Sequence, residues 1–178
     1  MSSVCVFCGS RKGARPEFEN VAKELGRLLS ERGHELVYGG GSIGLMGVCA
    51  DTVLAHGGQV LGVIPTFLDK VEIAHEGLQR MEVTSGMMPR KELMIEASDG
   101  FIALPGGLGT FDELLEVLTW KQLGQLDGPI GLLNAEGFFQ PWFGLVDHLV
   151  REKFLDPEAR ELLVVNETPS GLLDAMGL

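Results

Sequence analysis

The chain has 178 residues, with 14 basic and 25 acidic side chains and a formal net charge of −11 at pH 7. A surface with this charge repels polyanions, and the sequence has no basic patch that could follow a phosphate backbone, so we expect no nucleic-acid partner. No apolar stretch reaches the roughly 18 residues that a membrane span needs, so we expect no membrane insertion.

Glycine and aliphatic residues dominate the composition. There are 25 glycines, whereas aromatic residues make up only 7% of the chain. This balance is typical of an α/β protein with many tight turns between strands and helices. The length suits one domain, residues 1–178, with a substantial core.

The three cysteines indicate a reducing compartment. Cys5, Cys8 and Cys49 are an odd number, and no segment resembles a signal peptide, so we expect a cytoplasmic protein. Cys5 and Cys8 form C-x-x-C inside a β-type run rather than at a helix N-terminus. We therefore favour small buried residues over redox or metal chemistry, and we expect no metal ion.

Short apolar runs alternate with segments of helical periodicity along the whole chain. The expected strands are residues 2–8, 34–38, 59–64, 78–84, 100–104, 130–133 and 162–165, and the expected helices are residues 16–32, 45–56, 87–97, 110–123, 137–154 and 169–176. Such alternation implies right-handed βαβ crossovers and a doubly wound parallel sheet with helices on both faces.

The segment Gly39–Gly47 contains G-x-G-x-x-G between an expected strand and an expected helix. In that context the motif indicates a nucleotide phosphate. The dinucleotide version also needs an acidic residue at the end of the following strand, but that strand runs into Pro65 and Thr66, which argues against NAD. No G-K-[ST] follows, so a P-loop is excluded. The alternative is a plain tight turn for close helix–strand packing.

A second glycine-rich turn lies in residues 100–113, G-F-I-A-L-P-G-G-L-G-T-F-D-E. Glycines let the backbone approach a ligand closely, and the helix that follows favours an anion at its N-terminus. Thr110 and Glu113 have the spacing of a capping box, so an alternative role for Glu113 is only to cap its own helix.

Arg90 and Lys91 stand in the first turn of an expected helix, where cations interact unfavourably with the helix dipole. Their position favours an anionic partner. The alternative is a pair of ordinary surface bases at a mild cost.

Four stretches taken together resemble the Lonely Guy family: C-G-S (8–10), G-G-G-S-I-G-L-M-G (39–47), R-K-E-L-M (90–94) and P-G-G-L-G-T-F-D-E (105–113). Its members are cytokinin riboside 5′-monophosphate phosphoribohydrolases, long described as possible lysine decarboxylases. The resemblance covers nearly the whole chain. It implies a Rossmann-like fold, a homodimer, and hydrolysis of the N-glycosidic bond of an adenine-type nucleoside monophosphate without a cofactor.

The resemblance also implies which residues form the site. The family's catalytic pair falls on Arg90 and Glu113. Its substrate contacts fall on Glu72, Lys91, Thr119 and the turn made by Gly107, Leu108, Gly109 and Thr110. The two glycine turns and the loop after the first strand add Ser10, Gly40, Gly41, Gly44 and Gly106 as expected substrate contacts. Met88 stands where the family commonly has histidine, which leaves open whether the substrate is a cytokinin nucleotide or plain AMP.

The chemistry of these residue types agrees with hydrolysis. Breaking a ribosidic C–N bond develops positive charge at C1′, and a carboxylate such as Glu113 can stabilise that charge and activate water. The guanidinium of Arg90 suits either the phosphate or the departing purine.

Two other functions stay open at this point. A nucleotide-binding carrier could use the same turns without turnover. Lysine decarboxylation ranks third, since it needs a pyridoxal Schiff-base lysine, and the candidate Lys91 stands beside an arginine suited to phosphate.

Overall fold

The structure is a computed structural model that describes residues 1–68 and 74–178. The expected substrate contact Glu72 lies outside the described residues. Among the residues described, no helix combines the length and the apolar composition needed to cross a lipid bilayer.

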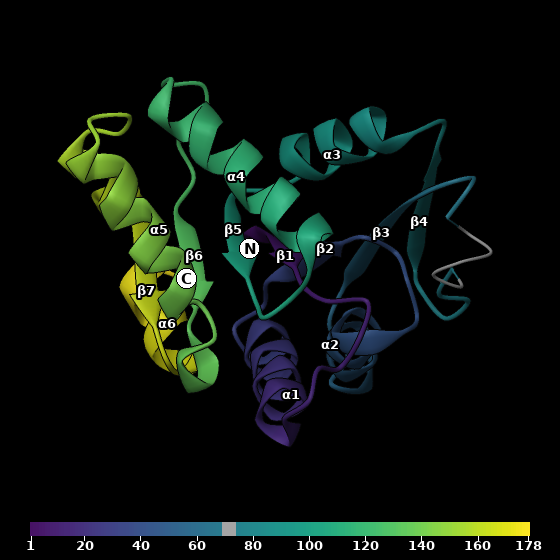
Figure 1. The fold of residues 1–178 in the computed structure, drawn as a ribbon. Helices are drawn as coiled ribbons and strands as arrows, with labels where there is room; N and C mark the ends of the chain where they lie inside the picture. Colours follow the sequence, from purple (N-terminus) through teal and green to yellow (C-terminus); the bar gives the residue numbers. More distant parts are fainter. Residues whose placement is uncertain (69–73) are drawn as a thin grey trace.

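Seven parallel strands form one sheet in the order β4-β3-β2-β1-β5-β6-β7 (Figure 1). They are β1 (Ser3–Phe7), β2 (Glu35–Tyr38), β3 (Val60–Pro65), β4 (Arg80–Thr84), β5 (Gly100–Ala103), β6 (Ile130–Leu133) and β7 (Leu163–Asn166). From β1 to β4, each successive strand is added on one side of β1. Strand β5 then lies on the other side of β1, and β6 and β7 extend the sheet in that direction. The predicted doubly wound parallel sheet is confirmed, and its topological switch point lies between β1 and β5.

Helices cover both faces of this sheet (Figure 1). One face carries α1 (Pro16–Glu31), α2 (Gly44–Ala55) and α6 (Pro169–Met176), and the other carries α3 (Met87–Glu96), α4 (Leu108–Gln122) and α5 (Gln140–Arg151). Two short 3₁₀ helices, η2 (Ala135–Gly137) and η3 (Pro157–Leu162), stand on either side of α5 in the chain.

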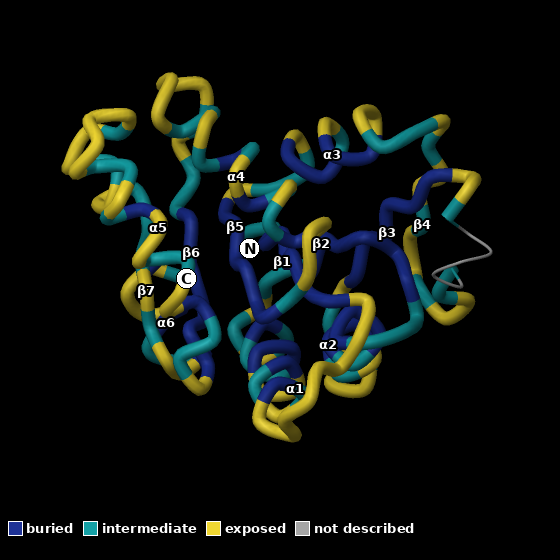
Figure 2. The backbone as a smooth tube through the Cα atoms, viewed as in Figure 1, coloured by how far each residue is buried: buried dark blue, intermediate teal, exposed yellow. Residues whose placement is uncertain are grey.

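Side chains of the central strands point alternately to the two faces of the sheet, so the core has two layers. Val4 and Val6 of β1 pack with α1 and α2 on one face, whereas Cys5 and Phe7 pack with α3 and α4 on the other. Successive side chains of a strand point to opposite faces, so a strand covered on both sides must be apolar throughout. Figure 2 shows these central strands buried.

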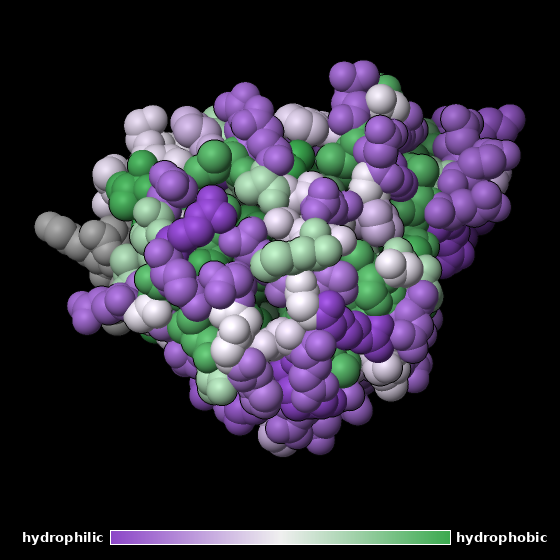
Figure 3. Space-filling model, turned by 180° about the vertical axis from the view of Figure 1, so that it is seen from behind, coloured by the Kyte–Doolittle hydropathy of each residue, from purple (hydrophilic) through white to green (hydrophobic). Residues whose placement is uncertain are grey.

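One face of the molecule has a mixed surface. On the face drawn in Figure 3, hydrophilic residues are interspersed with smaller hydrophobic areas. The edge strand β4 is more exposed than the central strands, and Val83 on it is 61% exposed.

Two helix starts differ from the sequence prediction by more than one residue. The helix expected at residue 110 begins at Leu108, because Gly107 in extended conformation is its N-cap. The helix expected at residue 137 begins only at Gln140, because Glu136 (φ 52°) and Gly137 (φ 68°) are left-handed and cannot belong to a regular α-helix.

The cysteines lie in the core. All three are buried. Burial raises the pKa of Cys49 to about 12, and burial is likewise the main cause of the raised pKa of Cys5. Both therefore stay as thiols at neutral pH, which agrees with packing rather than redox chemistry.

Candidate active site

Three loops meet at the carboxyl ends of the central strands. The N–H of Gly9, after β1, donates to the carbonyl of Pro105, after β5, at 3.1 Å. The carbonyl of Gly9 in turn accepts from the N–H of Leu45 in α2 at 2.9 Å. Open α/β sheets bind ligands at this switch point.

A cavity of about 510 Å³ opens between these loops. Four of the predicted substrate contacts line it, namely Ser10, Gly106, Gly107 and Leu108. Arg11, Phe18 and Phe138 line it too, and sequence reasoning missed them. Arg11 carried a usable signal, since it directly follows the predicted Ser10 in the loop after the first strand.

The turn before α4 is open to solvent. Gly107, Leu108 and Gly109 are exposed, and no side chain caps this end of the helix. A Cβ atom added at Gly107 or Gly109 would meet no protein atom within 4 Å. Backbone N–H groups at an uncapped N-terminus suit an anionic ligand.

The capping-box alternative for Glu113 is wrong. Because Gly107 is the N-cap, Thr110 lies inside the first turn of α4, where it is buried, and Glu113 lies in the second turn. Glu113 therefore does not cap its own helix.

The other glycine-rich turn is buried at its start and contacts other parts of the candidate site. The carbonyl of Gly40 accepts from the N–H of His75 at 3.0 Å, and Gly41 forms an isolated β-bridge with Ala74. Gly44, with φ 65°, packs so tightly on the loop after β1 that a Cβ would overlap the backbone of Ser10. Of these predicted contacts, Gly44 thus lies beside Ser10.

His75 anchors the segment that returns to this turn. Its ring Nδ1 accepts from the N–H of Gly77 at 3.1 Å, and its Nε2 lies 3.0 Å from Oδ1 of Asp51 on α2. Since Nδ1 is the acceptor, the proton is on Nε2, which donates to the carboxylate.

Arg90 is fixed by backbone carbonyls at the ends of two strands. Its side chain comes from the first turn of α3, and the residue is only 4% exposed. The Nε group donates to the carbonyl of Val63 at 3.1 Å, and Nη2 donates to the carbonyl of Gly39 at 2.8 Å. The third nitrogen, Nη1, lies 3.8 Å from Sδ of Met87. The guanidinium plane is therefore held in one orientation.

Glu113 lies on the same face of the sheet as Arg90. It lines a narrow gap with Phe7 of β1, Glu116 of α4, and Lys91, Met94 and Ile95 of α3. Burial chiefly raises the pKa of Cys5, the negative charge of Glu113 raises it further, and the positive charge of Arg90 lowers it. Both charges thus act on the same residue of β1.

Lys91 is buried and paired with α4. Its Nζ lies 2.9 Å from Oε2 of Glu116 and 3.1 Å from Oδ2 of Asp112. Sequence reasoning missed both partners, although the spacing of residues 112 and 116 places them on one side of a helix.

Thr119 is not brought to the other predicted residues within this chain. It is exposed on a different side of α4, and its hydroxyl donates to the carbonyl of Leu115 at 2.7 Å. It lines an apolar groove of about 910 Å³ between α4 and α5, together with Leu115, Trp142 and Leu145.

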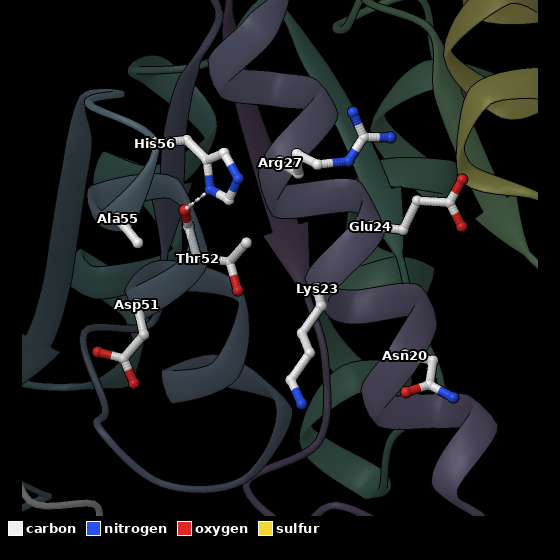
Figure 4. A pocket seen from close by; sticks show the side chains of 8 residues that line it. All are labelled: Asn20, Lys23, Glu24, Arg27, Asp51, Thr52, Ala55 and His56. Atoms are coloured by element: carbon white, nitrogen blue, oxygen red, sulfur yellow. Dashed lines mark hydrogen bonds between the residues drawn. The ribbon is translucent and has the colours of Figure 1, made fainter.

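A separate hollow of about 570 Å³ lies between α1 and α2, on the opposite face of the sheet (Figure 4). Its two basic side chains already have partners, since Lys23 pairs with Glu19 and Arg27 pairs with Glu31. None of the predicted site residues lines it, so we exclude it from the candidate active site. In the part of the chain that is described, no three His, Cys, Asp or Glu side chains are grouped to hold a metal ion.

The fold and these turns define a Rossmann-type α/β protein with a ligand crevice at the switch point. The family model described as "Possible lysine decarboxylase" matches residues 46–176, and the chain belongs to this family. The resemblance seen in the sequence motifs is confirmed.

Curated relatives agree over nearly the full chain. Probable cytokinin riboside 5′-monophosphate phosphoribohydrolase LOGL1 of Oryza sativa subsp. japonica is 49% identical over 97% of this chain and 78% of its own length. Cytokinin riboside 5′-monophosphate phosphoribohydrolase LOG of the same plant is 46% identical over 96% of this chain and 70% of its own length.

A solved structure shows the same fold at lower identity. The Moco carrier protein of Chlamydomonas reinhardtii superposes with a TM-score of 0.74 and 21% identity, covering 99% of this chain and 95% of that protein. At this identity the likeness concerns the fold alone.

Proposed function

We propose that this protein hydrolyses the N-glycosidic bond of adenine-type nucleoside 5′-monophosphates, the class that includes cytokinin riboside 5′-monophosphates. The products are the free base and ribose 5-phosphate. The names of the curated relatives support this reaction. The structural observation that carries it is the placement of Arg90 and Glu113 on one face of the sheet at the carboxyl ends of its central strands.

The open turn before α4 would hold the 5′-phosphate. Gly106, Gly107, Leu108, Gly109 and Thr110 form this turn and the first turn of the helix, where peptide N–H groups and the helix dipole attract an anion. Ser10, Gly40, Gly41 and Gly44 would complete the crevice. Glu72 is a further expected contact.

Glu113 would act at the sugar. As the C1′–N9 bond lengthens, positive charge develops at C1′, and the carboxylate stabilises it while accepting a proton from the attacking water. The bond electrons leave with the purine, which is then protonated. Arg90 offsets the negative charge of either the purine or the phosphate. This scheme needs neither a cofactor nor a metal ion.

A homodimer would account for Thr119. Within one chain its side chain faces the groove between α4 and α5, whose rim carries the exposed Leu115 (49%) and Leu145 (53%). A second copy seated on this groove would bury both leucines and bring Thr119 to the interface. Light scattering in solution measures the state directly.

The acidic surface and the cysteines support two further parts of the proposal. We place the protein in the cytoplasm, where buried cysteines such as these stay reduced. We expect no nucleic-acid partner at a net charge of −11. Residues 1–178 would form one nucleotide-binding hydrolase domain.

Base release from a panel of nucleoside monophosphates tests the reaction. We expect AMP or its N6-isopentenyl derivative to yield free base on chromatography, and the ratio of the two rates reports whether Met88 supports a decorated base. Glu113→Gln should lower kcat about 10³-fold, because it removes the base while keeping the shape. The exposed Glu96→Gln on α3 is the matched control and should keep full activity.

The melting temperature of Glu113→Gln shows whether a loss of activity comes from lost catalysis or from lost stability. Glu113→Gln should melt within a few degrees of the wild type, since α4 does not depend on Glu113 as a cap. Intact nucleotide in every reaction, with binding measured by calorimetry, would instead indicate the carrier alternative.

A further inference from the structure

Lys91 and its two carboxylate partners form an ion cluster that joins α3 to α4. The Lys91 side chain is 10% exposed, the Glu116 side chain 17% and the Asp112 side chain 57%. The ammonium donates a hydrogen bond to Asp112 at 3.1 Å and forms an ion pair with Glu116 at 2.9 Å. A buried ammonium held in this way does not reach out to a ligand without leaving its partners.

The cluster sits at the two turns that carry the proposed catalytic pair. Lys91 directly follows Arg90 on α3, while Asp112 directly precedes Glu113 on α4 and Glu116 follows it by three residues. Lys91, Glu113 and Glu116 line the same narrow gap, and Figure 1 shows α3 and α4 on the same face of the sheet. A change in the cluster would therefore shift Glu113 relative to Arg90.

The local charge argues against a phosphate at Lys91. An anion placed on its ammonium would face Asp112, Glu113 and Glu116, three carboxylates from one stretch of α4. Burial by itself would lower the pKa of Lys91, but its pairing with the carboxylates of Glu116 and Asp112 outweighs burial and raises the pKa. The ammonium therefore stays charged and balances these carboxylates. The open turn at residues 106–109 has no carboxylate and suits a phosphate better.

We propose that Lys91 is a positioning residue, which fixes the turn of α4 that bears Glu113 against the turn of α3 that bears Arg90, and that the substrate phosphate does not bind it. This inference rests on the proposed hydrolase function. It assigns Lys91 a role different from the substrate contact that the family resemblance implies.

Steady-state kinetics of Lys91→Met distinguish a positioning role of Lys91 from a direct contact with the substrate phosphate. A phosphate contact would raise KM for AMP and leave adenosine unaffected. A positioning role lowers kcat, because a displaced catalytic group costs rate rather than binding. We expect kcat to fall about 30-fold, KM for AMP to change less than about threefold, and the preference for AMP over adenosine to persist. Lys23→Met, which removes a lysine paired with Glu19 on α1, should leave kcat unchanged.

A double-mutant cycle tests the coupling. If Lys91 acts through Glu116, the variant Lys91→Met with Glu116→Gln should be about as slow as Lys91→Met alone, rather than showing the product of both losses. If Lys91→Met does not fold, Glu116→Gln and Asp112→Asn give the same kcat-against-KM comparison without emptying a buried position.

The inference is overturned if Lys91→Met raises KM for AMP tenfold or more at unchanged kcat, or if kcat and KM both stay at wild-type values. If the wild-type protein releases no base from any nucleotide, the hydrolase proposal is contradicted instead. In that case the positioning role falls with the hydrolase proposal, and the calorimetric affinity for AMP tests only the phosphate contact: a tenfold loss of affinity in Lys91→Met would show that the nucleotide binds Lys91.

Discussion

The glycine-rich turns at 39–47 and 105–109 each join a parallel strand to a helix, but the structure buries the start of one and exposes the other. Gly39, Gly40 and Gly41 are buried, whereas Gly107 and Gly109 are exposed. In the first turn the space that a side chain would occupy is filled by other parts of the protein. In the second turn, the space that a side chain would occupy at Gly107 and Gly109 is empty. Glycine at these two positions therefore leaves room for a bound ligand.

The neighbours of each glycine show this contrast. A Cβ at Gly39 would overlap Nη2 of Arg90, and one at Gly44 would overlap the backbone of Ser10, whereas Gly107 and Gly109 have no such neighbour. The turn at 39–47 therefore positions the Arg90 side chain and the loop of Ser10, and the turn at 105–109 is the better place for a ligand.

Gly44→Ala should give the largest effect and should act on folding. Alanine would need φ 65° and would overlap the backbone of Ser10, which cannot move as a side chain tip can. We expect the free energy of unfolding to fall by roughly 2–4 kcal/mol, measured by urea denaturation.

Gly57→Ala is the matched control for that experiment. Gly57 has φ 76° but no protein atom near its added Cβ, so it reports the backbone strain alone, about 1 kcal/mol. Equal losses in the two variants would show that the contact with Ser10 contributes nothing.

Gly39→Ala should act mainly on activity. Its Cβ would take the place of the Arg90 guanidinium, which would have to give up its hydrogen bond to the Gly39 carbonyl. We expect kcat/KM for AMP to fall about 100-fold, with a loss of about 1–2 kcal/mol in stability. Added to Arg90→Ala, Gly39→Ala should lower activity no further; a second full loss would mean that the two residues act independently.

The sequence predicted the strands, the helices and the sheet class because apolar runs and helical periodicity are local signals. It also placed both glycine turns at strand ends. It could not tell the buried turn from the open one, because the group that fills the space at Gly39 is Arg90, 51 residues away in the chain.

At the candidate site, too, local sequence patterns did not predict contacts between distant parts of the chain. Thr110 and Glu113 fit the capping-box spacing, yet an extended Gly107 begins the helix earlier and makes the motif coincidental. The partners of Lys91 come from a different helix, so no local rule points to them. Residue types at the site were readable from the sequence, whereas their pairing depends on how α3 and α4 pack.

Gly107→Ala should give the smallest effect on folding and the clearest one on binding. Gly107 has φ −98°, which alanine adopts readily, and its Cβ would meet no protein atom, so only the poorer N-cap matters and the stability should change by less than about 1 kcal/mol. If the phosphate rests on this turn, the added methyl group pushes it away, and KM for AMP should rise about tenfold while adenosine is unaffected. Gly144→Ala on α5, also without a neighbour, should leave KM unchanged. An unchanged KM in Gly107→Ala would place the phosphate elsewhere and remove the functional difference between the two turns.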